Sequence, residues 1–247
     1  MKTNIFTSLF IVALTVCACE KKTDEPLTRP VEFTETKYEP LGTYDEFGKP
    51  NYLLTKDPIS PELISFINSS LPEKKDLRST HPELLNSSAI GDIVITQQSD
   101  VFITFVSQGT AYANTFVYYT YPTNQPPTSP KDIIKVNYVF PNAGTGTPLQ
   151  AGDKVKIGSF SAGTSIGFAI LVDAWNPTTK TINNKAVHFL SNDVLNPEID
   201  PKLKKHAVLI SYPSENKVLI GFEDIDRTKL DCDHDFNDVV VYATVTP

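Results

Sequence analysis

Residues 221–224 read Gly-Phe-Glu-Asp, and after eight further residues positions 233–238 read Asp-His-Asp-Phe-Asn-Asp. Apolar runs flank this stretch at 218–222 and 239–242, and their length and β-branched residues predict two strands. Seven carboxylates fall between these runs, at positions 223, 224, 226, 231, 233, 235 and 238. The stretch therefore predicts a β-hairpin whose long connection is crowded with acidic side chains.

Crowded carboxylates repel one another, and the cost grows when their loop packs against a core. A bound cation removes this cost, and Ca²⁺ accepts roughly six to eight oxygen ligands in a flexible shell. We therefore predict a Ca²⁺ site in the hairpin. The predicted ligands are Glu223, Asp224, Asp233, Asp235 and Asp238, with Asn237 and Asp231 as further candidates.

The alternating acids at 231–235 have the spacing that begins an EF-hand loop. Phe236 stands where an EF-hand needs Gly, however, and Tyr242 stands where it needs Glu. Because strands rather than helices flank the loop, an EF-hand is excluded. The alternative to a metal site is a solvated acidic loop in which Asn237 and Asp238 cap the turn through backbone hydrogen bonds.

The chain has 247 residues, of which 40% are hydrophobic, and it carries a formal net charge of −7. This length accommodates one large β-domain with a short preceding segment, or two small domains. The acidic balance offers no basic face for phosphates, which argues against a nucleic-acid partner. It is compatible with cation binding.

Residues 1–18 have the pattern of a signal peptide, with Lys2 before an apolar run at 5–16 that is too short to span a bilayer. Residues 16–19, Val-Cys-Ala-Cys, resemble a bacterial lipobox with Cys19 as the lipid-bearing residue. The alternative is an ordinary secretory signal cleaved before Cys19. We expect an exported outer-membrane lipoprotein, either periplasmic or surface-exposed, whose acyl chains anchor it to the outer membrane.

Residues 19–50 are rich in Lys, Asp, Glu, Thr and Pro, a composition that buries little apolar surface and predicts a flexible tether. Residues 51–91 carry the helical signals of the chain. Ser60 is a candidate N-cap before Pro61, and apolar residues follow at helical spacing. We expect this short helical segment to pack on the β-domain that follows.

From residue 92 onward the hydrophobic period changes to two and β-branched residues dominate. The predicted strands are 93–96, 101–106, 115–121, 134–140, 154–157, 165–172, 186–190, 207–211, 218–222 and 239–244. Long helices do not alternate with these strands, so a parallel sheet is disfavoured. We predict that residues 92–247 form an all-β domain, an antiparallel β-sandwich or a jelly-roll-like fold, that ends in the acidic hairpin.

The C-terminal acidic pattern resembles an uncharacterised domain family found at the C-terminus of many bacterial exported proteins and akin to the LruC domain. Similar pieces upstream extend this resemblance over roughly residues 92–246. The chain departs from the family at Gln108, where an acid is expected, and at 225–230, where a Gly-rich linker is expected. The resemblance implies a β-sandwich, calcium binding through the acidic motif and no established activity. The motif stands here at Gly221, Phe222, Glu223, Asp224, Asp233, Asp235, Phe236, Asn237, Asp238, Val239 and Val240.

We expect a lipid-anchored envelope protein whose calcium-binding sandwich acts as a binding or adhesion module for a glycan or protein ligand. One alternative is a structural envelope component in which calcium only stabilises the fold. Another is a polysaccharide hydrolase, for which Glu223 and Asp224 are the candidate acids. Neighbours on a strand point to opposite faces, however, and the sequence has no nucleophile elbow, Cys–His pair or HExxH motif. We therefore expect no enzymatic activity.

Aromatic side chains provide a candidate stacking surface for sugars. The favoured alternative is that these residues pack into the core, as tyrosines at strand positions usually do. Trp175 precedes a turn and is the candidate for an exposed residue, because loops at one end of a sandwich often carry the binding site. The residues concerned are Tyr112, Tyr118, Tyr119, Tyr121 and Trp175.

Overall fold

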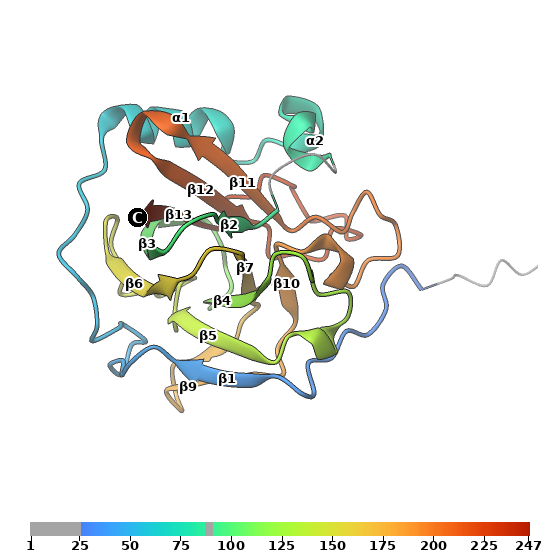
Figure 1. The fold of residues 1–247 in the computed structure, drawn as a ribbon. Helices are drawn as coiled ribbons and strands as arrows, with labels where there is room; N and C mark the ends of the chain where they lie inside the picture. The colour runs from blue at the N-terminus through green and yellow to red at the C-terminus, as the bar shows by residue number, and fades with distance from the viewer. Residues whose placement is uncertain (1–25, 87–90) are drawn as a thin grey trace, which may run out of the picture.

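The computed structural model describes residues 26–86 and 91–247, which form two facing β-sheets (Figure 1). The strands are β1 (Lys37–Pro40), β2 (Ile93–Ile95), β3 (Ser99–Gln108), β4 (Thr115–Pro122), β5 (Lys135–Phe140), β6 (Lys154–Phe160), β7 (Thr164–Leu171), β8 (Trp175–Asn176), β9 (Thr181–Ile182), β10 (His188–Leu190), β11 (Ala207–Tyr212), β12 (Lys217–Phe222) and β13 (Val239–Thr246). One sheet has the order β1-β5-β4-β7-β10, with β2 also paired to β7. The other has the order β11-β12-β13-β3-β6, and β8 pairs with β9 alone.

Every strand predicted from residue 93 onward overlaps a strand of the structure. The strand pairs are antiparallel except for β1 with β5. The predicted antiparallel β-sandwich is therefore confirmed. The short strands β8 and β9 were not predicted, because two residues each are too few to show an alternating pattern.

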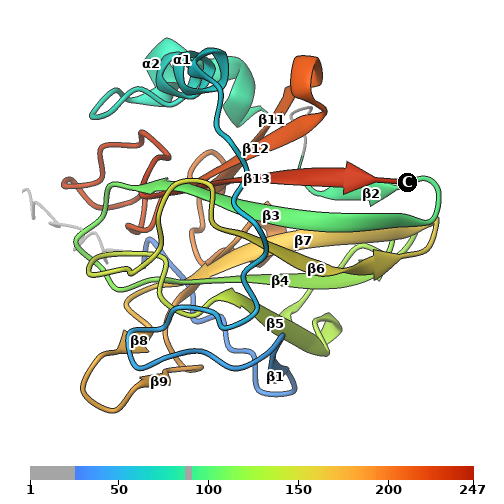
Figure 2. The ribbon, with the colours of Figure 1, turned by 90° about the vertical axis from the view of Figure 1, so that its left-hand side faces the viewer.

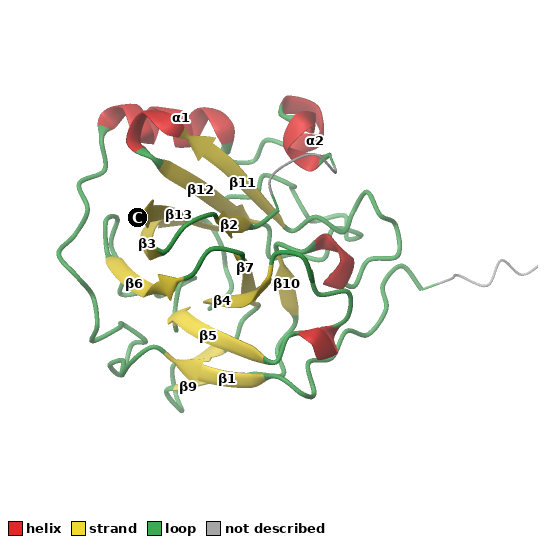
Figure 3. Cartoon of the chain, viewed as in Figure 1, coloured by secondary structure: helices red, strands yellow, loops and turns green. Residues whose placement is uncertain are grey.

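Helices cover the outer face of the sheet that contains β12 and β13 (Figure 2). Ser60 Oγ accepts a hydrogen bond from Leu63 N at 3.1 Å, so the first helix begins at the predicted cap. Leu63 and Ile67 are buried against Leu219. Figure 3 separates the helices from the strands by colour. They are α1 (Pro61–Ser70), α2 (Leu77–Thr80) and the 3₁₀ turns η1 (Pro82–Leu85), η2 (Pro130–Asp132), η3 (Asp193–Leu195) and η4 (Pro213–Glu215).

The main core lies between the two sheets and is rich in aromatic side chains. Phe116 stacks on Phe168 with ring centroids 5.8 Å apart, and it also contacts Phe222 edge-on at 5.9 Å. Each of these fully buried rings contributes about 1.5–3 kcal/mol through removal of apolar surface from water. Since Phe222 is the last residue of β12, this core fixes the strand end from which the acidic connection departs.

The N-terminal segment differs from the predicted flexible tether at 19–50. Within its described part, β1 pairs with β5 in parallel, and Phe33 stacks on His188 at 4.5 Å. Tyr38 joins the apolar cluster on the outer face of this sheet. This packing could not be predicted from the composition of the segment, because only a few aromatic residues among charged residues and prolines make the contacts.

Most of the aromatic residues considered as a candidate sugar-stacking surface pack into the protein, as the favoured alternative predicts. Trp175 is 3% exposed and packs edge-on against Tyr44, while Tyr118 and Tyr119 are buried in the sandwich. Tyr112 is 36% exposed. The expectation of an exposed Trp175 is therefore wrong, because β8 carries its ring into the protein.

The predicted signal peptide at 1–18 and the predicted lipid-bearing Cys19 lie outside the described residues. Across 26–86 and 91–247, each helix is too short or too polar to cross a membrane.

The imidazole of His188 is buried and makes two hydrogen bonds. Its Nδ1–H donates to Ala186 O at 2.8 Å, and its Nε2 accepts from the Tyr38 hydroxyl at 2.7 Å. Burial lowers the pKa of His188 from 6.5 to about 4. Between these values the unfolded chain binds the extra proton, so the folded state loses stability as pH falls through this window.

We predict that His188→Gln flattens this part of the pH dependence, which amounts to up to about 3 kcal/mol between pH 6.5 and 4. Thermal melts across this range measure the effect. His81→Gln is the matched control, since it removes a partly exposed histidine before η1. If the melting temperature fell equally steeply with pH in the wild type and in His188→Gln, the pH dependence would not come from His188.

Candidate metal centre

The acidic connection leaves β12 and returns to β13 directly beside it. Phe222 and Val239 are paired across the two strands. Asp238 N donates to Phe222 O at 3.1 Å, and Glu223 N donates to His206 O at 2.9 Å. These backbone bonds place the acids that follow β12 next to the acid that precedes β13.

The returning half of the connection, residues 233–238, folds by alternating backbone conformations. His234 and Phe236 have φ angles of +58° and +59°, a left-handed region that costs a non-glycine residue about 1–3 kcal/mol. The Phe236 ring is fully buried beside α1, which offsets this cost. Gly221 permits the approach, because a Cβ there would lie 2.4 Å from Phe236 O. The buried Phe236 ring thereby fixes the position of Asp235, which lies between the two residues with positive φ.

Five of the seven predicted ligands come together in two overlapping groups. One oxygen from each of Glu223, Asp233 and Asp235 lies within 4.8 Å of the other two. The same is true of Glu223, Asp224 and Asp238. The two groups share Glu223, so its carboxylate is the centre of the cluster.

Asp231 belongs to neither group in the part of the chain that the structure describes. Asp231 is exposed. The side-chain amide of Asn237 donates to Leu71 O at 3.4 Å. The structure therefore gives Asn237 a role in joining the loop to the end of α1.

Glu223 is fully buried, with 0% of its surface exposed. Ile225 N donates to Oε1 at 3.3 Å, whereas Oε2 has no hydrogen-bond partner. Burial, followed by the charge of Asp233, raises the pKa of Glu223 to about 7. Because a buried carboxylate oxygen without a donor is costly, this geometry favours a cation or a proton at Oε2.

Asp224 and Asp238 form the second half of the cluster. Asp224 N donates to Asp238 Oδ2 at 2.8 Å. Burial, and then the charge of Asp224, raises the pKa of Asp238 to about 10, and burial also raises the pKa of Asp224. Two adjacent buried carboxylates ionise together only when positive charge lies near them.

Asp224 is oriented by the segment between β3 and β4. Its Oδ2 accepts from Thr110 Oγ1 and from Asn114 Nδ2, the latter at 2.5 Å. Asp224 and Glu223 lie beyond the last residue of β12, so the alternation of strand side chains does not apply to them. Their carboxylates converge, and the expectation that the two acids point to opposite faces is wrong.

Asp235 is oriented by the segment that follows α1. Lys74 N donates to Oδ2 at 2.7 Å, and Asn237 N donates to Oδ1 at 3.1 Å. Leu77 N also donates to His234 O at 3.0 Å. The helical segment therefore holds the acidic loop through backbone donors, in addition to packing on the sheet.

Arg227 brings positive charge into the same loop and is only 2% exposed. Its Nε donates to His234 Nδ1 at 3.1 Å, and its Nη1 donates to Lys205 O at 2.8 Å. The guanidinium lies 5.1 Å from the centroid of the Phe236 ring. Its charge acts on Glu223 and offsets part of the repulsion in the cluster.

A second buried pair lies behind Glu223. His206 Nδ1–H donates to the Glu223 carbonyl oxygen at 3.0 Å, and His206 Nε2 lies 2.8 Å from Glu198 Oε1. Both side chains are fully buried, and Phe189 stacks on the imidazole with centroids 3.6 Å apart. This pair fixes the backbone from which the central carboxylate projects.

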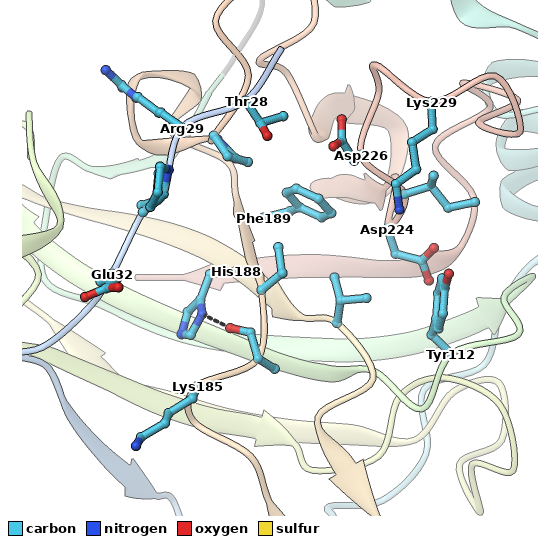
Figure 4. Close-up of a pocket in the computed structure, with 17 residues that line it drawn as sticks. Thr28, Arg29, Glu32, Tyr112, Lys185, His188, Phe189, Asp224, Asp226 and Lys229 are labelled. Atoms are coloured by element: carbon cyan, nitrogen blue, oxygen red, sulfur yellow. Dashed lines mark hydrogen bonds between the residues drawn. The ribbon is translucent and has the colours of Figure 1, made fainter. Parts of the chain in front are cut away.

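Asp224 also lines a surface pocket of about 640 Å³ (Figure 4). Figure 4 shows Tyr112 and Lys229 next to Asp224, with Phe189 between Asp224 and Arg29. Residues 28–32 form the opposite wall. The acid cluster therefore borders a pocket of the size that small ligands occupy.

Residues 160–246 match the model of a family described as a domain of unknown function (DUF4114). The match begins at the last residue of β6 and contains the whole acidic connection. No curated protein and no solved structure matches the chain. The match supports the expected likeness to an uncharacterised domain family.

Several residues that shape the site were not identified from the sequence. The turn before β4 contributes the donors Thr110 and Asn114, where an acid had been expected at Gln108. Lys74 contributes only its backbone N–H, which leaves no sequence signature. Arg227 carried a usable signal, since it is one of two basic residues among the seven carboxylates.

We predict that Glu223→Gln raises the melting temperature of the chelated protein at pH 8 and abolishes its response to Ca²⁺. The amide keeps the shape of the side chain but removes the central charge, and each kcal/mol of relieved repulsion is worth roughly 2–4 °C for a domain of this size. Melts in chelator and in Ca²⁺ measure both effects. Asp231→Asn is the matched control, because it removes one exposed carboxylate outside both groups. A Glu223→Gln variant that Ca²⁺ still stabilises would exclude Glu223 as a ligand.

Proposed function

We propose that this chain is a calcium-binding β-sandwich that acts as a binding or adhesion module of the cell envelope. The observation that carries the proposal is the fully buried Glu223, whose unpartnered Oε2 lies among four further carboxylates. These donors are all oxygens, which favours a hard cation that accepts many oxygen ligands. Carbonyl oxygens of the loop and water would complete the shell.

Ca²⁺ is favoured over Zn²⁺ by the side chains around the cluster. Zinc sites prefer His and Cys ligands. Cys232 and His234 contact each other at 3.2 Å, and His234 Nδ1 already accepts from Arg227. Burial raises the pKa of the Cys232 thiol well above its usual range, which keeps it protonated and a poor metal ligand.

We predict that Ca²⁺ binds saturably and raises the melting temperature, and that Asp235→Ala with Asp238→Ala removes both effects. The reason is that the double substitution takes one carboxylate from each group around Glu223. Calorimetric titration and melts in chelator measure the two responses on the chain without its first 19 residues. Identical melts with and without Ca²⁺, together with no binding heat, would overturn the metal site.

The binding role is supported by the pocket beside Asp224. A Ca²⁺ ion on this carboxylate would lie at the pocket wall, where its flexible shell could accept hydroxyl or carboxylate oxygens from a ligand. Tyr112 adds a partly exposed ring, a common contact for sugars. Glycan or protein ligands with such oxygens are therefore the proposed partners.

We predict calcium-dependent retention on a glycan array that is lost in Tyr112→Ala. Removal of the ring deletes a wall of the pocket without changing a carboxylate of the cluster. Phe47→Ala is the matched control, because Phe47 is 60% exposed and does not line this pocket. Equal retention in chelator and in Ca²⁺ would contradict a calcium-dependent sugar site.

The second candidate is a structural role in which calcium only stabilises the fold. It is favoured by the hydrogen bonds that join the acids to Lys74 and to the turn at Thr110. An ion in the cluster would fasten these segments to the hairpin. This role leads to calcium-dependent melting without a calcium-dependent ligand, so the two experiments above separate the candidates.

The proposed lipid anchor is supported by the sequence at 16–19 alone. In this proposal Cys19 carries the acyl chains and the β-sandwich is held at the outer membrane, on its periplasmic or outer face. Fractionation of cells that express Cys19→Ser tests the anchor. Membrane retention of this variant equal to the wild type would contradict it.

A further inference from the structure

We infer that the acid cluster holds two cations and that the Glu223 carboxylate bridges them. This inference rests on the proposed metal site and extends it from one ion to two. It follows from three observations: the spacing of the carboxylates, the burial of Glu223 with an unpartnered oxygen, and the total charge of the cluster.

The spacing divides the acids into two sets. Two oxygens bound to one Ca²⁺ lie no more than about 5 Å apart, since each ligand distance is about 2.3–2.6 Å. Within the described residues this limit is met by two groups of three, and not by one group of five. Asp233 and Asp235 belong to one group, Asp224 and Asp238 belong to the other, and Glu223 belongs to both. One ion therefore satisfies one group and leaves the other without a cation.

Glu223 has the properties of a bridging ligand. It is fully buried, its Oε2 has no hydrogen-bond partner, and its Oε1 receives a long bond of 3.3 Å from Ile225 N. The carboxylate lies within reach of both pairs of flanking acids. Because a carboxylate has two oxygens that can each bind a different ion, it can give one oxygen to each ion.

The flanking acids are already oriented for this arrangement. Asp224 uses Oδ2 for Thr110 and Asn114, and Asp238 uses Oδ2 for the backbone of Asp224. These bonds hold both carboxylates beside Glu223. On the other side, Lys74 N fixes Asp235 through a backbone bond, while Asp233 is exposed and can adjust.

The enclosed charge also fits two ions. The five carboxylates carry five negative charges when ionised, so a single divalent cation leaves three uncompensated. A second divalent cation leaves one, and the neighbouring Arg227 guanidinium carries the charge that balances it. Uncompensated charge in a buried site is costly, so the doubly occupied cluster is favoured.

Native mass spectrometry of the purified chain in Ca²⁺, with calorimetry for the stoichiometry, tests the inference. We expect two ions for the wild type, one for Asp235→Asn, one for Asp224→Asn and none for Glu223→Gln at the same Ca²⁺ concentration. Asp231→Asn, the matched control, should keep two. Circular dichroism in chelator establishes that each variant is folded before its ions are counted.

The outcomes separate the inference from the proposed function. A single ion in the wild type overturns the bridged pair and leaves the calcium site standing. No ion in the wild type overturns both. Two ions that persist in Glu223→Gln overturn the bridging role, because they would bind independently of the shared carboxylate. The loss of one ion in each flanking variant and of both in Glu223→Gln supports it.

Discussion

Repulsion among the clustered carboxylates of the acidic connection is the constraint on which the rest of the site depends. Glu223 lies at the centre of five acids and is fully excluded from water, so each neighbour makes its ionised form more costly. The surrounding structure offsets this cost with hydrogen-bond donors and one positive charge. Backbone N–H groups reach Asp235 and Asp238, and a buried guanidinium lies in the same loop. The fold holds the acids together instead of letting them separate, as the proposed cation site requires.

Most strands of the sandwich were predictable from the sequence, because each shows an alternation of apolar and polar residues or a run of apolar residues. Alternating apolar residues predicted both strands of the C-terminal hairpin and the strands that face it, and Ser60 marked the start of α1. The docked N-terminal segment was not predictable in this way. Its strand β1 has the partner β5 almost a hundred residues further along the chain, and its side chains are mostly exposed. Only the folded sheet shows that Tyr38 has a surface to cover.

The candidate site was predictable in its acids and not in its supports. Carboxylates crowded into one loop are visible in a sequence, whereas Thr110, Asn114 and the N–H of Lys74 are ordinary residues until the fold brings them close. The distribution of these parts along the chain is informative. The acids belong to the segment that matches the family of unknown function, and the three supports lie before residue 160. The upstream strands and helices therefore complete a site that the matched segment begins.

The contact between Thr28 and Glu198 gives the molecule a mechanical property. These residues form a β-bridge, and Arg29 N donates to Pro197 O at 2.8 Å, so the N-terminal segment is fastened next to the buried Glu198. Glu198 in turn holds His206, which supports the carbonyl of Glu223. A pulling force on the N-terminal side would load this bridge before it reached the sandwich core. The force would thus act first at Thr28 in the wall of the pocket that Asp224 also lines.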